Sequence, residues 1–525
     1  MSDSSIESSS SSSSPAQRRK LSPVCRFVAA HPYWFILLLS LLIGFGSMLL
    51  FSTALSPLYG EMSYNLVGVD SNFFLWCGKE ILAGKKPYLN FDDHKGILIF
   101  YYAALGELFG GRGGVAFLNG LTLFLSTYFT LLGLKAYFQD LRSVLLGASL
   151  LFFFYAFTPG GNQNGEIILP FTALALLFFL LALRSGRKRY FLFGTLTSGV
   201  LVAIAFHARP SDAFPGIGFC VAYLVYWILH RKEQGIHLLY NVLSALGSFA
   251  LVFGLLLLFC QQQGYLEEML DAVWLQNFSY GHKMKSVGEI ALIVILALYL
   301  VFVLVETVRL VKRKSEDLDL VLFLAVSSVL FIVPNFFYAK YIQYWISEFP
   351  VTAAFLVLVL ESFPHAFGKK RNVTLTTLSR RVLPVTSLVI ALGFLVTFYG
   401  LSDPRFSKKE SDLARAEIEE VIPEAEMGKP DNIYVLDANS VVLFWTDNKP
   451  EHTPEICYQS WHTSFRPELE QEIEGYIDTW KPAYVIQGRD QALATYDYTS
   501  YLEKDYHVVT PTRYDSSLIK VWVRN

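Results

Sequence analysis

Long apolar runs recur along most of the chain and constrain its fold more than any other feature. About eleven runs are near the length that a membrane's hydrocarbon core requires of an α-helix. They are residues 33–55, 115–138, 143–157, 166–183, 190–207, 213–229, 238–260, 289–310, 318–333, 349–363 and 382–401. Of the 525 residues, 17% are charged, against about 25% in a soluble domain. The sequence therefore predicts an α-helical polytopic membrane protein with its membrane domain at residues 33–401.

The start of the chain and its overall charge narrow the class further. Residues 1–20 are serine-rich and almost devoid of apolar side chains, which is typical of a disordered tail, and we place the whole of this cytoplasmic tail at residues 1–32. The run that follows is long enough to span and lacks a small-residue cleavage site, so we expect a retained first span. A formal net charge of −2 gives no electrostatic case for a nucleic-acid partner.

The five cysteines show no metal-ligand spacing. Cys77 and Cys457 are expected on the same side of the membrane, and the sequence leaves open whether they pair. It likewise leaves open whether a divalent metal ion binds, and it implies no other cofactor.

A shorter apolar segment, residues 96–109, decides the topology. Segments of this length are more often interfacial than spanning. If this one does not span, the basic cluster at 18–20 lies on the same side as those at 187–189 and 369–371, which is the positive-inside pattern. If it spans, the cluster at 18–20 lies on the opposite side of the membrane from all the other basic clusters. We therefore predict that 96–109 lies on the outer interface of the plasma membrane and that the N-terminus is cytoplasmic.

Beyond residue 401 the chain becomes charged and rich in tyrosine. Four segments have the β-branched and aromatic composition of short strands, and residues 467–480 have helical spacing. The predicted strands are 432–437, 483–488, 506–510 and 518–523. We expect residues 402–525 to form a small extracytoplasmic α/β domain.

The outer loop between the first two spanning runs, residues 56–114, is the first place to look for chemistry, because a long charged loop there has no packing purpose. Asp70 precedes an apolar-periodic stretch and suits two roles, an ordinary helix N-cap and a base for an attacking hydroxyl. Asp92, Asp93, His94 and Lys95 stand directly before segment 96–109. Such a charged run is usually a solvated turn. A lysine at headgroup level can also hold a lipid-linked phosphate, together with the N-terminus of the following helix.

Two other outer turns carry candidate residues. Glu166 begins a span after a turn that contains Asn164. Its place suits the helix dipole, but a carboxylate costs about 2.5–3.5 kcal/mol at a membrane helix centre and less near the end, which favours a functional role. Arg209 is the only cation in its outer loop, and it suits either phosphate binding or snorkelling to the interface.

Aromatic side chains accumulate in two later outer segments, where an interfacial belt explains many of them. Aromatic faces beside polar groups also suit sugar recognition. The candidate substrate contacts are Asp92, Asp93, His94, Asn164, His282, Tyr341 and Tyr344.

The order of these features resembles that of the GT-C membrane glycosyltransferases. The matching parts are a first span, an outer loop opening with Asp70, an ILAGKKPY turn, DDHKG before an amphipathic helix ending in LFG, and Asn and Glu after the third span. More narrowly, the pattern is similar to the branch that holds protein mannosyltransferases, lipid A aminoarabinose transferases and RgtA/B/C/D-like enzymes. The resemblance covers about residues 33–363.

The resemblance implies transfer of a sugar from a polyprenyl-phosphate donor to a glycan, lipid or protein acceptor of the cell envelope on the outer face. It implies catalytic carboxylates at Asp70 and Glu166, and a cation for the donor phosphate at Lys95, helped by Arg209. The alternative is a transporter or flippase of lipid-linked sugars. The concentration of charge in outer loops and the lack of an obvious inverted repeat oppose that alternative. A membrane sensor or assembly protein is a third hypothesis.

Overall fold

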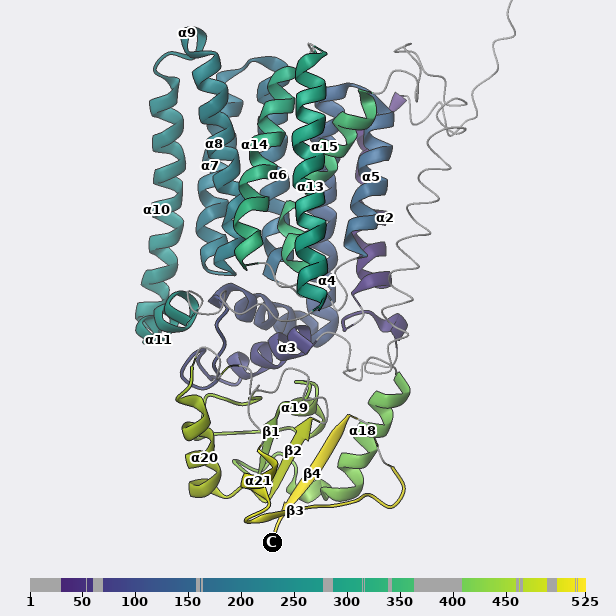
Figure 1. Ribbon diagram of the computed structural model, residues 1–525, viewed down its shortest axis with the longest axis vertical. Helices are drawn as coiled ribbons and strands as arrows, with labels where there is room; N and C mark the ends of the chain where they lie inside the picture. The colour runs from purple at the N-terminus through teal and green to yellow at the C-terminus, as the bar shows by residue number, and fades with distance from the viewer. Residues whose placement is uncertain are drawn as a thin grey trace, which may run out of the picture.

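A bundle of long helices fills one end of the molecule, and a small domain with a four-stranded sheet fills the other (Figure 1). The computed structural model describes residues 30–52, 54–59, 69–156, 161, 164–276, 287–313, 315, 317–338, 342–362, 408–458, 462, 466–488, 498–514, 516 and 518–525. The predicted tail, apart from its last residues, the predicted span 382–401 and the predicted domain boundary at 402 lie outside these ranges.

The bundle confirms the predicted class of a multi-pass membrane protein. Within the described ranges, nine helices are long and apolar enough to cross a membrane, and α5 is a shorter apolar helix. The bundle helices are α2 (Pro32–Phe51), α4 (Ile97–Phe138), α5 (Leu141–Tyr155), α6 (Asn164–Ser185), α7 (Lys188–Phe206), α8 (Phe214–Leu229), α10 (His237–Gln263), α13 (Val287–Lys312), α14 (Leu318–Tyr338) and α15 (Phe349–Glu361). Every predicted span other than 382–401 corresponds to one of them.

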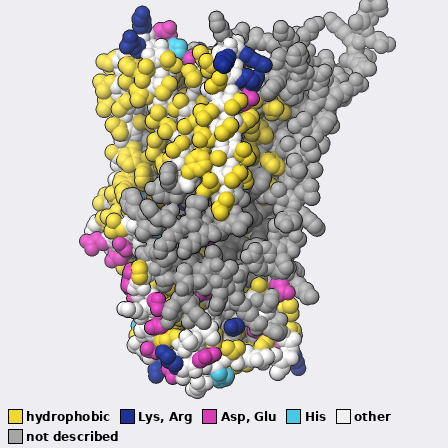
Figure 2. Space-filling model, viewed as in Figure 1, with side chains coloured by type: hydrophobic (Ala, Val, Ile, Leu, Met, Phe, Trp, Pro, Cys, Tyr) yellow, Lys and Arg dark blue, Asp and Glu magenta, His cyan; other side chains and the backbone are white. Residues whose placement is uncertain are grey.

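The surface of the bundle has the character that lipid contact requires. Figure 2 shows hydrophobic side chains over its visible face, with lysine and arginine gathered at the end away from the sheet. Helix α10 illustrates the cause, because none of its most apolar 18-residue window is buried within the protein. A soluble protein does not leave such a helix unburied, so lipid is its expected environment.

Helix α4 contains the predicted interfacial segment. At 42 residues it would be about 63 Å long if straight, about twice the hydrocarbon thickness. It breaks at Gly110 and Gly111, and Gly111 has φ 58° and ψ −144°, a conformation open to glycine. The break separates residues 97–109 from the spanning part of the helix. The predicted short helix before the second span is therefore present.

The short segment 97–109 packs on helix α3 (Val69–Leu82), which lies between the bundle and the sheet (Figure 1). The two helices approach closely, since a Cβ added at Gly78 would lie 2.7 Å from the carbonyl carbon of Ala103. Leu105 and Leu108 remain exposed on the other side of the segment. One apolar face is thus buried and another is left for the membrane interface.

The C-terminal part has the predicted α/β composition. Its sheet has the order β1-β2-β4-β3, with β1 parallel to β2 and the other pairs antiparallel. Its elements are α18 (Lys408–Val421), β1 (Ile433–Leu436), α19 (Val442–Trp445), α20 (Leu469–Trp480), β2 (Tyr484–Gly488), α21 (Thr499–Leu502), β3 (Tyr506–Val508) and β4 (Ile519–Arg524). All four predicted strands and the predicted helix are present.

The C-terminal domain and the outer loop share one hydrophobic core. Val435 and Ile486 of the sheet belong to the same buried cluster as Phe74 of α3 and Phe91 of the loop. The domain therefore packs firmly on the loop that contains Asp70. Cys77 and Cys457 are not joined by a disulfide bond, which answers the question of their pairing.

Candidate active site

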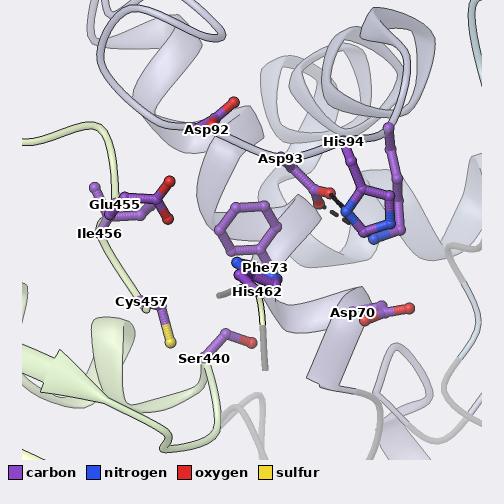
Figure 3. A pocket seen from close by; sticks show the side chains of 11 residues that line it. Asp70, Phe73, Asp92, Asp93, His94, Ser440, Glu455, Ile456, Cys457 and His462 are labelled. Atoms are coloured by element: carbon purple, nitrogen blue, oxygen red, sulfur yellow. Dashed lines mark hydrogen bonds and ion pairs between the residues drawn. The ribbon is translucent and has the colours of Figure 1, made fainter. Parts of the chain in front are cut away.

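A pocket forms where the outer loop meets the C-terminal domain (Figure 3). Figure 3 shows Asp93 and His94 on one side of it, and Glu455 and Cys457 on the other. Its lining residues are Asp70, Phe73, Asp92, Asp93, His94, Lys95, Ser440, Glu455, Ile456, Cys457 and His462. Five of the residues predicted from the sequence, Asp70 and the run 92–95, thus line one pocket.

The turn at residues 92–95 is fixed at both ends by its neighbours. Before it, the Tyr88 amide donates to the Phe91 carbonyl at 2.7 Å, and the Tyr88 hydroxyl donates to the Lys95 carbonyl at 2.7 Å. Phe91 is fully buried and packs edge-on against Phe100 of the following helix. The charged run is therefore a braced turn and not a freely solvated one.

Asp93 is the acceptor that organises the charged side chains of this turn. Its Oδ1 lies 3.1 Å from Nδ1 of His94, and its two oxygens lie 3.2 and 3.3 Å from Nζ of Lys95. Burial by itself lowers the pKa of Lys95, but the carboxylates of Asp93 and Asp70 outweigh it and raise that pKa overall. Lys95 therefore remains a cation in a largely buried position.

Asp70 is the second residue of α3 and lies in its first turn, not at the predicted N-cap, and the helix dipole favours a carboxylate there. It contributes to the raised pKa of Lys95 and also to that of Arg209. For Arg209, burial acts in the lowering direction, and Asp212 is the main opposing charge. The carboxylate of Asp70 is thus within electrostatic range of both predicted phosphate-binding cations.

Arg209 is oriented by two side chains, one of which is supported by a third. Its Nε and Nη2 donate to Asp212 at 3.0 and 2.6 Å, and its guanidinium lies 4.1 Å from the centre of the Tyr344 ring. Ser347 donates to Asp212 at 3.1 Å. Tyr344 and Ser347 belong to the short helix η4 (Ile342–Glu348). The structure thereby associates the predicted residues Arg209 and Tyr344.

The first turn of the 97–109 segment differs from the prediction of an open anion site. The Gly96 amide donates to the Ala208 carbonyl at 2.8 Å, and the Leu98 amide donates to the His207 carbonyl at 2.9 Å. A Cβ at Gly96 would collide with the carbonyl of His207. Two of the amides that a helix N-terminus offers are therefore occupied by the protein itself, a long-range pairing that the sequence does not reveal.

Glu166 and Asn164 lie in the first turn of α6 and are buried, with Glu166 only 1% exposed. Nδ2 of Asn119 donates to Oε2 of Glu166 at 2.6 Å, and the Ser52 hydroxyl donates to Oδ1 of Asn119 at 2.9 Å. Neither Glu166 nor Asn164 lines the pocket of Figure 3. Glu166 adjoins Arg209 indirectly, since a Cβ at the neighbouring Gly165 would lie 3.5 Å from Nη2 of Arg209. Of the remaining predicted contacts, His282 and Tyr341 lie outside the described residues.

The C-terminal domain contributes residues that the sequence did not indicate. Nη1 of Arg466 lies 2.6 Å from Oδ2 of Asp92 and 3.1 Å from Oε1 of Glu455. Burial raises the pKa of both carboxyl groups, and Arg466 opposes the rise. The His462 ring meets the His94 ring edge-on with centroids 6.3 Å apart. Burial, and then His94, lower the pKa of His462 to about 3, so its imidazole is neutral.

Metal binding finds no support in the arrangement of these side chains. Across the described part of the chain, no three or more His, Cys, Asp or Glu residues are grouped so that they could hold a metal ion.

These features define a GT-C fold: a helical bundle, an outer loop with an interfacial helix, and a small α/β domain over that loop. ArnT from Cupriavidus metallidurans bound to undecaprenyl phosphate aligns with a TM-score of 0.58 and 12% identity, over 94% of this chain and 98% of that chain. The same enzyme in its apo state aligns with a TM-score of 0.59 and 13% identity, again over 94% of this chain and 98% of that chain. The Archaeoglobus fulgidus oligosaccharyltransferase in its apo form aligns with a TM-score of 0.45 and 13% identity, over 88% of this chain and 70% of that chain. No protein-family model and no curated protein matches the sequence. At these identities the likeness to the two ArnT structures establishes the fold alone, and the predicted fold class is confirmed.

Proposed function

We propose that the protein is an integral membrane glycosyltransferase that transfers a sugar from a polyprenyl-phosphate donor to an acceptor of the cell envelope. The observation that carries the proposal is the setting of Asp70, a carboxylate within electrostatic range of two largely buried cations, Lys95 and Arg209. The ArnT structure that shares the fold contains undecaprenyl phosphate, which supports a lipid-linked donor.

Lys95 and Arg209 would bind the donor phosphate. Charge accumulates on the phosphate as its bond to the anomeric carbon breaks, and fixed cations stabilise that charge most where water is excluded. Lys95 is restrained by Asp93, and Arg209 by Asp212 and Tyr344. Both cations are thus pre-oriented and need little reorganisation during the reaction.

Asp70 would act as the base. A hydroxyl oxygen of the acceptor forms a bond to the anomeric carbon while the bond to the phosphate oxygen breaks, through an oxocarbenium-like state. The hydroxyl proton passes to the Asp70 carboxylate, and the polyprenyl phosphate leaves with the bonding electron pair. A glycan, lipid or protein hydroxyl would each satisfy this step.

Glu166 would support the donor site from within the bundle. Its contact with Asn119 anchors the start of α6, which is next to Arg209 through Gly165. We retain it as the second functional carboxylate predicted from the sequence.

The orientation proposed for the chain follows from its charges. Basic side chains gather at the bundle end away from the sheet (Figure 2), and basic loops stay in the cytoplasm. The N-terminus would therefore be cytoplasmic, and the pocket and C-terminal domain would face outward.

The test uses the purified full chain with a panel of polyprenyl-phosphate sugars and measures released polyprenyl phosphate. Asp70→Asn should lower turnover by about 10² to 10⁴ by removing the base. Lys79→Met is the matched control, because Lys79 is an exposed cation on the same helix. Equal turnover by wild type and Asp70→Asn would refute the catalytic assignment. Substrate flux into vesicles without any transfer would support the transporter hypothesis instead.

A further inference from the structure

Arg466 connects the C-terminal domain to the turn that contains Lys95. Its Nη1 lies between Oδ2 of Asp92 at 2.6 Å and Oε1 of Glu455 at 3.1 Å. The Asp92 amide also donates to the Pro454 carbonyl at 2.9 Å. Asp92 is therefore held by the C-terminal domain through both its side chain and its backbone.

The contacts continue from Asp92 to the cation of the pocket. Asp93 follows directly in the chain and binds His94 and Lys95, and Figure 3 shows Asp93 directed toward His94. The far end of the turn is braced by the Tyr88 hydroxyl on the Lys95 carbonyl. A displacement of Asp92 would therefore change the position of Nζ of Lys95.

The charge balance at this point depends on Arg466. Side chains of Asp92 and Glu455 are 13% and 7% exposed, and two carboxylates so enclosed repel each other unless a cation stands between them. Glu468 and Glu472 also approach Arg466, at 3.6 and 3.7 Å, but more than half of each side chain is exposed. Solvent screens those two pairs, so their contribution is small.

We propose that Arg466 is a positioning residue, which fixes the turn at residues 92–95 by compensating Asp92 and Glu455 and thereby sets the place of Lys95 for the donor phosphate. The claim that Lys95 is placed for the donor phosphate rests on the proposed function. The claim that Arg466 fixes the position of Lys95 does not. Arg466 acts through Asp92, so its loss should change donor binding more than the chemical step.

The first experiment measures acylation of Lys95 in the full chain by a water-soluble amine-reactive ester, followed by mass spectrometry without any substrate. Arg466→Met should raise the labelling rate about tenfold, because the unbalanced carboxylates displace the turn. Arg466→Lys should fall between Arg466→Met and wild type, since a lysine keeps the charge but not the forked geometry. The triple variant Asp92→Asn/Glu455→Gln/Arg466→Met removes the charge conflict and should label at nearly the wild-type rate.

Lys79→Met is the control for a general loosening of the two domains. It breaks another contact between them, the 3.3 Å pair of Lys79 with Asp447, whose side chains are about half exposed. Its Lys95 labelling should equal that of wild type. The proposal is overturned if Arg466→Met labels as slowly as wild type, or if Lys79→Met labels as fast as Arg466→Met. If Arg466→Met does not fold, Arg466→Lys and the triple variant decide, and a triple variant that labels faster than Arg466→Lys overturns the role in charge compensation.

The second experiment separates this proposal from the function itself. With an active donor, Arg466→Met should raise the donor KM about tenfold and change kcat much less, and Arg466→Lys should restore part of the loss. A fall in kcat at unchanged KM would overturn the positioning role. If wild type uses no polyprenyl-phosphate sugar, the proposed function fails, and the labelling experiment still decides the role of Arg466.

Discussion

Lys95 is the residue on which the proposed donor site depends, because its charge is maintained by two carboxylates in a largely buried setting. Its side chain is 12% exposed, and Nζ lies 5.5 Å from the centre of the Phe74 ring. Because little water surrounds this cation, its attraction for a phosphate is strong. Its loss would leave Asp93 with His94 but without the lysine that compensates its charge.

Lys95→Met should therefore weaken donor binding strongly. Truncating one partner of a buried charge pair costs at least about 2 kcal/mol, which corresponds to roughly a 30-fold rise in the donor KM. Steady-state kinetics with the donor varied would measure it. Lys95→Arg keeps the charge and should lose less. A donor KM unchanged in Lys95→Met would exclude Lys95 from the phosphate site.

His462 should make the protein sensitive to acid. Its pKa of about 3, lowered by burial and then by His94, is far below the ordinary value of about 6.5. As the pH falls below about 6.5, the unfolded chain takes up a proton that the folded protein refuses until about pH 3. The stability that His462 contributes is thus complete above pH 6.5 and is lost progressively toward pH 3.

The measurement compares unfolding of wild type and His462→Gln. Between about pH 7.5 and about pH 5, wild type should lose about 2 kcal/mol more than the variant. Burial raises the pKa values of Asp92 and Glu455, so these two groups make the folded state more stable as the pH falls. This effect is opposite to that of His462 and is present in both proteins. The difference between the two proteins therefore isolates His462, and parallel pH profiles would contradict the assignment.

Local signals explain which site residues the sequence could indicate. Asp70, Asp92, Asp93 and Lys95 stand in one polar loop between apolar runs, so their composition marks them without any structure. Arg466 lies more than 370 positions after Asp92, and only the docking of the C-terminal domain brings the two together. The sequence did not identify Asn119 as the partner of Glu166 for another reason. One polar residue in an apolar run indicates that its side chain has a polar partner, but it does not indicate which residue that partner is.

At the level of elements, the break in α4 determines how the site sits on the bundle. Gly106 and Gly114 let the two parts of the helix meet, since a Cβ at Gly114 would collide with the carbonyl of Gly106. The break makes the first part a separate short helix that begins directly after Lys95. The sequence predicted this helix from its short length and from the positive-inside charge pattern, but not the carbonyl partners of its first turn.

Gly111→Ala should destabilise the protein by about 1–3 kcal/mol, because φ 58° with ψ −144° is strained for any side chain. Thermal unfolding in detergent would measure the loss. The control is Gly247→Ala in α10, where an added Cβ meets nothing within 4 Å and should be neutral or slightly stabilising. Equal melting temperatures for Gly111→Ala and wild type would show that the break tolerates other conformations.

At the scale of the whole molecule, the pocket belongs to neither part alone. The core shared by Val435, Ile486, Phe74 and Phe91 means that the C-terminal domain closes the pocket as a fixed wall. Apolar periodicity and strand composition predicted the bundle and the sheet because both signals are local. The docking of one on the other is a property of surfaces assembled from distant segments, which no local pattern contains.

The arrangement of the whole molecule across the membrane can be tested directly. Lys232 in α9 (Arg231–Gln234) and Glu424 in the C-terminal domain are exposed. Helix α9 and the C-terminal sheet lie at opposite ends of the molecule (Figure 1). In a background without native cysteines, Glu424→Cys should react with a membrane-impermeant maleimide added to intact cells. Lys232→Cys should react only after permeabilisation, because basic loops remain in the cytoplasm. The reverse pattern would put the pocket on the cytoplasmic side, where an outer-face acceptor could not reach Asp70. Labelling of both variants in intact cells would mean that the cells leak or that the orientation is mixed. If the maleimide does not label Glu424→Cys in intact cells, the basis for an extracytoplasmic transfer is removed.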